Sequence, residues 1–252
     1  MWEDPDVPQQ RLLRHGAAVV IPAFNEQQRI GATVLAAAQI TGVDCVVVVD
    51  DGSTDRTAEL AMQAGAHVVR APKNRGKAAA MERGAAQVAA LEDAAGLSGR
   101  PLLFLDADLE STATAAGVLL PPVLRGQSDM TIAILPRQIV AGGGHGFVVR
   151  LAQDGIEQAT AWRAIQPLSG QRALTRAAFD AALPLASGWG VEVGLTIDLV
   201  RKGFRVSEIP TEFHHRVTGT DWRAKRHRAR QFWAVWRTLR ARGVGPVLPI
   251  PR

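Results

Sequence analysis

The sequence contains a single cysteine and lacks any long apolar run. Cys45 is the only cysteine among 252 residues, so no internal disulfide can form, and we expect it to pack as a small buried hydrophobic residue. No apolar stretch reaches the roughly 18 residues that a membrane-spanning helix needs. Residues 1–15 are polar and include Pro5 and Pro8, which argues against a secretory leader. These absences favour a soluble, cytoplasmic protein without a spanning anchor.

Acidic residues are scarce at the C-terminal end. The formal net charge of +5 conceals an asymmetry, because residues 1–215 hold 19 basic and 23 acidic side chains, whereas residues 216–252 hold 10 basic side chains and a single acid, Asp221. The body is therefore mildly acidic and the tail is strongly basic. A basic tail favours an anionic partner, such as a phosphate, a membrane surface or a nucleic acid.

Short apolar runs alternate with helical patterns along the first half of the chain, and no internal repeat interrupts them. The length suits one large α/β domain, or at most two. The expected strands cover residues 17–21, 45–49, 67–69, 102–105 and 130–135, and the expected helices cover 29–40, 57–64 and 77–95. This alternation predicts an α/β fold in which helices flank a mainly parallel sheet. Later elements are expected as helices near 148–162 and 193–200 and a strand at 206–213.

Two carboxylates follow the expected fourth strand, at Asp106 and Asp108. The apolar run 102–105 ends at Asp106-Ala107-Asp108, so both acids lie where a strand ends and its loop begins. Ligands bind at that edge of an open parallel sheet. Hard divalent cations take oxygen ligands and hold substrate phosphates through one or two carboxylates. The spacing therefore predicts a cation site for a diphosphate, with a solvated surface loop as the alternative for this motif taken alone.

Three further polar segments follow expected strands. They are 22–26 (Pro-Ala-Phe-Asn-Glu), 50–55 (Asp-Asp-Gly-Ser-Thr-Asp) and 73–77 (Lys-Asn-Arg-Gly-Lys). Carboxylates at strand ends accept hydrogen bonds from a base or from ribose hydroxyls. The glycine at 76 lets the backbone approach a ligand closely, and the lysine after it offers an ammonium to a diphosphate. Taken singly, the acid-glycine pair at 51–52 is equally typical of a turn, and Lys77 of a solvated helix start.

In this order, the four elements resemble the nucleotide-sugar-binding half of family 2-like glycosyltransferases, which have the GT-A fold. The resemblance covers residues 17–135 and implies a Rossmann-like, mainly parallel sheet followed by a C-terminal acceptor-side portion. It also implies a hexosyltransferase that uses Mg²⁺ or Mn²⁺ and a nucleoside-diphosphate sugar, with UDP-glucose as the expected donor. The nucleotide-binding residues that it implies are Pro22, Phe24, Glu26, Asp51, Ser53, Gly76, Lys77, Asp106 and Ala107.

The second half resembles two groups within this family. Glucosyl-3-phosphoglycerate synthases share a glycine-rich element (142–146), Gln-Pro-Leu-x-Gly (166–170), a Gly-x-Gly-Val-Glu run (188–198) and a late His-Arg (215–216). Transferases of the dolichol-phosphate mannose synthase type are similar over 208–219, where an arginine faces phosphate. The resemblance implies Asp108 and His215 as metal ligands. The acceptor-binding residues that we expect from it are Gly144, His145, Ser169, Gly170, Trp189 and Arg216.

Glu192 and Lys77 are the expected catalytic residues. Lys77 would stabilise charge on the departing nucleoside diphosphate, and Glu192 would orient an acceptor hydroxyl or take its proton. A phosphate acceptor is already anionic and needs no base. The fuller match at 188–198 favours retention at the anomeric carbon, with an inverting polyprenyl-phosphate reaction at a membrane surface as the alternative. His145 and Phe147 stand where the phosphoglycerate enzymes carry Arg and Thr, which weakens the case for phosphoglycerate itself.

Residues 220–242 are expected to form a basic amphipathic helix. Such a helix lies on an anionic membrane, at the inner face here, or docks on the catalytic body or on the second subunit of a homodimer. We favour docking, and we expect no nucleic-acid partner because no recognised module accompanies the charge. The apolar residues near one face are Trp222, Ala229, Phe232, Trp233, Trp236 and Leu239. The chain thus divides into an extension (1–16), a nucleotide-sugar half (17–141), an acceptor and metal-completing half (142–219) and the tail (220–252).

Other function classes fit less well. A nucleotidyltransferase shares the metal logic, but it usually carries a glycine-rich loop after the first strand, where this chain has the segment 22–26. A dehydrogenase needs Gly-x-Gly-x-x-Gly near its start, and the glycine cluster at 142–146 comes too late. A nucleotide-sugar-binding protein without catalytic activity remains an alternative, because it would keep the same donor site.

Overall fold

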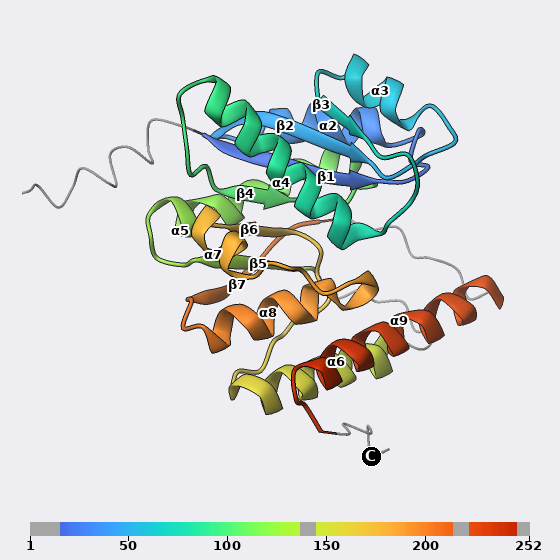
Figure 1. Cartoon of the computed structure of the whole chain (residues 1–252), viewed down its shortest axis with the longest axis vertical. Coiled ribbons are helices and arrows are strands. Elements are labelled where there is room, and N and C mark those ends of the chain that lie inside the picture. The colour runs from blue at the N-terminus through green and yellow to red at the C-terminus, as the bar shows by residue number, and fades with distance from the viewer. Residues whose placement is uncertain (1–15, 137–144, 214–221, 246–252) are drawn as a thin grey trace, which may run out of the picture.

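The computed structural model describes residues 16–136, 145–213 and 222–245, which form three layers around one sheet (Figure 1). Within these ranges seven strands pair in the order β3-β2-β1-β4-β6-β5-β7. Every pairing is parallel except those of β6, which runs antiparallel to β4 and β5. The strands are β1 (Ala17–Ala23), β2 (Val43–Asp50), β3 (His67–Arg70), β4 (Leu102–Phe104), β5 (Met130–Ile134), β6 (Arg172–Leu174) and β7 (Val206–Pro210). The predicted α/β fold with a mainly parallel sheet is confirmed.

Alternating side chains of the central strands supply two separate cores. In β1 and β2, Val19 and Val48 pack on one face of the sheet, whereas Val20 and Val47 pack on the other. Strands that are buried on both faces need continuous apolar runs, which is why the sequence shows Val46 to Val49 without a polar interruption. Helices α2 (Ile30–Ala38) and α3 (Thr57–Gln63) and the 3-10 helix η1 (Glu110–Leu119) cover the first face. Helices α4 (Lys77–Ala94), α7 (Arg176–Ala181) and α8 (Val191–Arg201) cover the second.

A third layer lies on helix α8. It consists of α6 (His145–Thr160) and α9 (Trp222–Ala241), which run beside each other in Figure 1. Leu151 of α6, Ile197 of α8 and Leu239 of α9 share one buried cluster. The remaining short helices are α5 (Leu120–Leu124) and the single 3-10 turn η2 (Gly188–Gly190). In the part of the chain that the structure describes, no helix is both long enough and apolar enough to cross a membrane.

The basic tail docks on the body, as the preferred interpretation predicted. Val235 and Leu239 are buried in the cluster that α9 shares with α6 and α8, and Arg242 forms an ion pair with Asp198, whose role is therefore structural. The predicted apolar stripe was wrong at two positions, because Ala229 and Trp233 are exposed. The helical angle places Val235 and Thr238 on the packed side instead, where Thr238 lies against Gly190 of η2.

Several element boundaries differ from the prediction, and three of the differences concern residues singled out in the sequence. Gly146, expected in a flexible glycine-rich element, lies in the first turn of α6. Glu192 lies inside α8 rather than in a loop before it, because the helix begins at Val191 directly after η2. The last strand ends at Pro210 instead of Phe213, which is consistent with Pro210 having no amide hydrogen to donate.

Candidate active site

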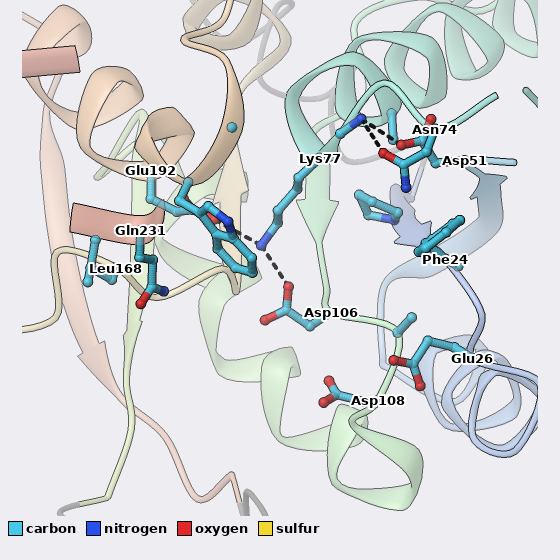
Figure 2. A pocket seen from close by; sticks show the side chains of 17 residues that line it. Phe24, Glu26, Asp51, Asn74, Lys77, Asp106, Asp108, Leu168, Glu192 and Gln231 are labelled. Carbon is cyan, nitrogen blue, oxygen red and sulfur yellow. Dashed lines mark hydrogen bonds and ion pairs between the residues drawn. The ribbon is translucent and has the colours of Figure 1, made fainter. Parts of the chain in front are cut away.

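A cavity of about 560 Å³ opens at the carboxyl ends of β1, β2 and β4, the edge at which the motifs were expected to meet (Figure 2). The first half of the chain supplies one wall, and η2, α8 and α9 supply the other. The lining residues are Pro22, Ala23, Phe24, Glu26, Asp51, Asn74, Gly76, Lys77, Ala80, Asp106, Ala107, Asp108, Leu168, Gly188, Trp189, Glu192 and Gln231. The site is therefore assembled from segments that lie far apart in the sequence.

The loop after β1 is fastened to the loop after β2. The amide of Asn25, which has a positive φ of 56°, donates to the Ser53 hydroxyl at 2.9 Å. The amide of Glu26 donates to the Thr57 hydroxyl at 2.8 Å. These bonds hold Phe24 and Glu26 at the cavity wall. Ser53 is buried and lies behind the wall, so its observed contact is with the protein backbone.

Asp51 organises the loop that leads into helix α4. Its carboxylate accepts hydrogen bonds from the amides of Arg75 (3.0 Å) and Gly76 (2.7 Å). Gly76 has a φ of 87°, a conformation that favours glycine, and no protein atom lies within 4 Å of the place a Cβ would occupy. The positive φ explains why a glycine stands at this position, which the sequence alone did not reveal. The turn at Gly76 places Lys77 at the start of α4, from where its side chain points into the cavity.

The ammonium of Lys77 lies between two carboxylates from the two halves of the chain, as Figure 2 shows. Its Nζ is 2.7 Å from Oδ1 of Asp106 and 2.9 Å from Oε1 of Glu192. Burial alone would lower the pKa of Lys77, but the two carboxylates outweigh it and raise that pKa above its ordinary value. Lys77 is therefore a permanent cation at neutral pH. The two predicted catalytic residues are in direct contact.

Asp106 is held on both of its oxygens. Lys77 takes Oδ1, and the side-chain amide of Gln171 donates to Oδ2 at 2.7 Å. Gly170 lies so close that a Cβ there would be 2.7 Å from the Asp106 oxygens, so the loop before β6 packs directly on this carboxylate. Asp106 thus acts as an anchor for Lys77. Ser169 lies behind the cavity, where its hydroxyl donates to Gln171.

Asp108 is different, because it is exposed and its carboxylate makes no hydrogen bond within the described residues. Burial raises the pKa of Glu26, the Arg29 guanidinium opposes that rise, and the Asp108 carboxylate adds to it. Two acids that repel each other across a cavity suit a hard cation, which takes carboxylate oxygens. Among the described residues no cluster of three or more His, Cys, Asp or Glu side chains forms a complete site. The donors present therefore fit a cation that shares its coordination with substrate phosphates.

The opposite wall of the cavity combines apolar side chains with the Glu192 carboxylate and one side-chain amide. Trp189 is 43% exposed and, with Leu168, lines the side where an acceptor was expected. Gln231 of α9 adds one amide group to this wall, as Figure 2 shows. Phe147, on α6, stacks against Phe232 with ring centroids 5.3 Å apart, so its ring is engaged in aromatic packing.

Most of the predicted site residues that the structure describes line this cavity. The exceptions are Ser53, Ser169 and Gly170, which support it from behind. His145 begins α6, and nothing is described of its side chain. Gly144, Arg216 and the predicted metal ligand His215 lie outside the described residues, so the second half of the metal prediction stays a prediction.

Sequence reasoning missed Gln171, Gln231 and the buried Arg172. Arg172 begins the three-residue strand β6 and Gln171 directly precedes it, so no long periodic pattern marked either residue. Gln231 had a weak signal, since it is an uncharged amide within a helix dominated by arginine, aromatic and aliphatic residues. Its approach to the cavity depends on how α9 packs, which the sequence does not encode locally.

Comparison with known proteins decides the family. The model of glycosyl transferase family 2 matches residues 18–148, the part of the chain that carries the motifs after β1, β2 and β4. The chain belongs to glycosyl transferase family 2. The resemblance inferred from the motifs is thereby confirmed.

Two curated members of the family extend the similarity beyond the matched region. Glycosyltransferase AglJ of Haloferax volcanii is 32% identical over 214 residues, which are 81% of this chain and 64% of that protein. Glucosyl-3-phosphoglycerate synthase of Mycobacterium tuberculosis is 31% identical over 203 residues, 72% of this chain and 60% of that protein. The chain thus spans less than two thirds of the length of these relatives.

Solved structures of the same mycobacterial synthase share the fold of this family 2 chain. One superposes with a TM-score of 0.72 at 26% identity and covers 97% of this chain and 84% of the other. Another, crystallised with Mn²⁺, UDP and phosphoglyceric acid, gives a TM-score of 0.71 at 25% identity over 100% of this chain and 86% of the other. The GT-A architecture expected from the sequence is therefore confirmed.

Proposed function

We propose that the chain transfers a hexose from a nucleoside-diphosphate sugar, UDP-glucose in the first instance, to a small-molecule or phosphate-bearing acceptor with retention of configuration. The observation that carries this proposal is the Lys77 ammonium, which lies between Asp106 and Glu192 inside the cavity. A fixed cation beside the donor half can stabilise a departing diphosphate. Glu192, from the second half of the chain, lies next to this ammonium on the side where an acceptor would enter.

The donor assignment rests on the relatives and on the wall formed by β1, β2 and β4. A structure of the mycobacterial synthase, similar to this chain with a TM-score of 0.71, was crystallised with Mn²⁺, UDP-glucose and phosphoglyceric acid. In this chain Glu26 and Asp51 line the cavity at the carboxyl ends of the strands, where their carboxylates can accept hydrogen bonds from a nucleoside. Phe24, which is 45% exposed at the same wall, offers a ring face for a base.

A divalent cation, Mg²⁺ or Mn²⁺, completes the proposed donor site. Asp108 would hold it, together with His215 of the late His-Arg and the phosphates of the donor. When bound, such an ion supplies positive charge that stabilises the leaving diphosphate. The protein residues do the rest: Asp106 and Gln171 keep Lys77 directed at the cavity, and Glu192 is positioned to orient an acceptor hydroxyl.

The acceptor is the least constrained part of the proposal. The mycobacterial relative is named for glucosylation of phosphoglycerate, which carries a carboxylate and a phosphate. In this chain Lys77 is the single cationic side chain among the described residues of the cavity, and it already faces two carboxylates. Phe147 stacks on Phe232 and cannot hydrogen-bond an acid. Arg216, outside the described residues, is the candidate for an acceptor phosphate.

The proposal is tested by following UDP release from UDP-glucose in the presence of Mn²⁺, with phosphoglycerate, simple polyols and a short polyprenyl phosphate as acceptors. Acceptor-dependent UDP release, followed by NMR assignment of the anomeric configuration, would support glycosyl transfer and decide between retention and inversion. Pyrophosphate release from a nucleoside triphosphate would indicate a nucleotidyltransferase instead. Tight UDP binding without turnover by any acceptor would favour a binding protein and would overturn the enzymatic proposal.

We also propose peripheral contact with an anionic membrane surface through helix α9. On its outer face Arg230, Arg237 and Arg240 are exposed beside Trp233, which is 57% exposed, and the helix contains no acid. Exposed basic and aromatic side chains at helical spacing favour anionic lipid headgroups. Sedimentation with vesicles that contain phosphatidylserine, but not with pure phosphatidylcholine, is expected, and Trp233→Ala should weaken it. Equal sedimentation with both vesicle types would contradict the contact.

A homodimer is a further proposal, which follows from the alternative that a second subunit covers part of the tail. Light scattering of the purified chain measures the molar mass directly. A mass near 27.0 kDa at micromolar concentration would contradict the dimer, whereas twice that mass would support it.

A further inference from the structure

Arg172 is the largest fully buried side chain of the described core, and it has no ion-pair partner there. It begins β6, is 1% exposed and pairs through the backbone with Phe104 of β4 and Ile132 of β5. Burial lowers the pKa of Arg172 to about 10, although the negative charges of Glu192 and Glu208 oppose that change. A buried charge without a counterion is costly unless hydrogen bonds compensate it. The hydrogen bonds that compensate the charge of Arg172 identify the segments that this residue connects.

The guanidinium of Arg172 binds two separate segments of the chain. Toward the loop before β6, Nε donates to the Ser169 carbonyl at 2.8 Å and Nη2 donates to the Pro167 carbonyl at 3.0 Å. Toward helix α8, Nη1 donates to the Glu192 carbonyl at 3.0 Å and to the Thr196 hydroxyl at 2.8 Å. Thr196 in turn donates to the Glu192 carbonyl at 2.9 Å. One planar group therefore joins the loop and the first turn of α8.

Both joined segments carry groups that face Lys77. The loop presents Gly170 against the Lys77–Asp106 pair and continues into Gln171, which binds Asp106. The first turn of α8 presents the Glu192 carboxylate, which is the second partner of Lys77. Arg172 thus connects the two segments that carry groups around Lys77, although it does not line the cavity.

We propose that Arg172 is a positioning residue that sets the Glu192 carboxylate against Lys77 by tying the segment 167–170 to the first turn of α8. This inference rests on the proposed transfer reaction for its catalytic consequence, but not for the tie itself. A lysine at this position cannot reproduce the tie, because its three donors radiate from one atom instead of a planar fork. The hydroxyl of Thr196 completes the connection and offers a smaller change at the same place.

Turnover of UDP-glucose is the first test. Arg172→Lys should lower kcat by about 10- to 100-fold, because a displacement of about 1 Å in a catalytic group has effects of that order. The KM for the donor should change less than about twofold, since the donor wall is untouched. Thr196→Val should lower kcat, and Thr196→Ser, which keeps the hydroxyl, should recover most of the loss. The matched control is Arg205→Lys, because Arg205 pairs with Asp129 at the opposite edge of the sheet.

A double-mutant cycle separates positioning from a general loss of stability. If Arg172 acts through Glu192, then Arg172→Lys should cost little further kcat in a Glu192→Gln background. Losses that multiply in the double variant, or an unchanged kcat in both Arg172→Lys and Thr196→Val, would overturn the inference. If Arg172→Lys fails to fold, the kcat of Thr196→Val decides the test instead.

Hydrogen exchange tests the tie without any turnover. Amides of 165–171 and of 191–197 should exchange faster together in Thr196→Val than in the wild type, and Arg205→Lys should change neither segment. Faster exchange in one segment alone, or in neither, would contradict the tie. If the wild type proves inactive with every acceptor, the proposed function fails, whereas this measurement still decides whether Arg172 joins the two segments.

Discussion

At the scale of single residues, the chemistry of the site centres on one lysine shared by two acids. Lys77 faces Asp106 from the first half of the chain and Glu192 from the second. Removing it would leave the buried Glu192 carboxylate and the partly exposed Asp106 carboxylate without a cation, and the proposed diphosphate without the positive charge of the lysine. The motif at 73–77 predicted a role for this lysine, but the contact with Glu192 joins positions more than a hundred residues apart and has no local signature.

Lys77→Met should therefore reduce kcat by about 100-fold or more, as the loss of one electrostatic stabiliser typically does. In the wild type the pKa of Lys77 is raised above the ordinary value of 10.5. The stability that the Lys77 ammonium contributes is therefore fully present below that value and is lost only as pH rises through the raised pKa. The stability difference between variant and wild type should accordingly stay constant from pH 6 to 9 in thermal melts. Lys202→Met, at the far end of α8, is the control. A difference that fades toward pH 8 would contradict the ion pairs.

Glu26 also has a raised pKa, but its effect on stability falls in the acid range. Burial and the Asp108 carboxylate raise the pKa of Glu26 above 4.5, so the folded protein keeps this proton to a higher pH than the unfolded chain does. The wild type should therefore lose stability relative to Glu26→Gln as pH rises through that window. The melting temperature of the variant minus that of the wild type should be larger at pH 7 than at pH 4. An equal difference in melting temperature at both pH values would contradict the raised pKa of Glu26.

At the scale of elements, the strand-end motifs were predictable from the strand pattern, whereas the opposite wall was predicted only in part, at Trp189 and Glu192. Carboxyl ends of parallel strands converge, so the polar segments after β1, β2 and β4 could be placed together from the sequence alone. The second wall depends on β6, which is three residues long and begins with Arg172, and on the docking of α9 against η2. The strand β6 has no periodic pattern, and the apolar periodicity of α9 predicted docking but not the contact with η2, because that contact arises from packing between distant segments.

The docking of α9 can be tested with two substitutions on the same helix. Leu239 is buried against α6 and α8, so Leu239→Ala should lower the free energy of unfolding by about 3 kcal/mol. Trp233 is exposed, and Trp233→Ala should cost about 0.5 kcal/mol or less. Because Gln231 reaches the cavity from this helix, Leu239→Ala should also raise the KM for the acceptor more than that for the donor. Similar denaturation midpoints for the two variants would contradict the packing.

At the scale of the whole molecule, one sheet edge brings together side chains from the first half of the chain and side chains from η2, α8 and α9. The fold class, the direction of most strands and the sheet edge that carries the cavity followed from the alternation of elements and from the family resemblance. The antiparallel β6 and the exact partners of Asp106 did not, since they depend on which distant segments pair. The charge asymmetry of the chain also acquires a location, because the exposed arginines of α9 lie on the outer layer.

The central claim is that a divalent cation and a nucleoside diphosphate bind together at this edge through Asp108. Calorimetric titration of UDP with and without Mn²⁺ tests it most directly, with Asp108→Asn as the variant and Asp93→Asn, exposed near the far end of α4, as the matched control. We predict that Mn²⁺ tightens UDP binding at least about tenfold in the wild type and in the control, as differential cation and phosphate contacts allow, and has no such effect in Asp108→Asn. An equal Mn²⁺ effect in all three proteins would contradict the account.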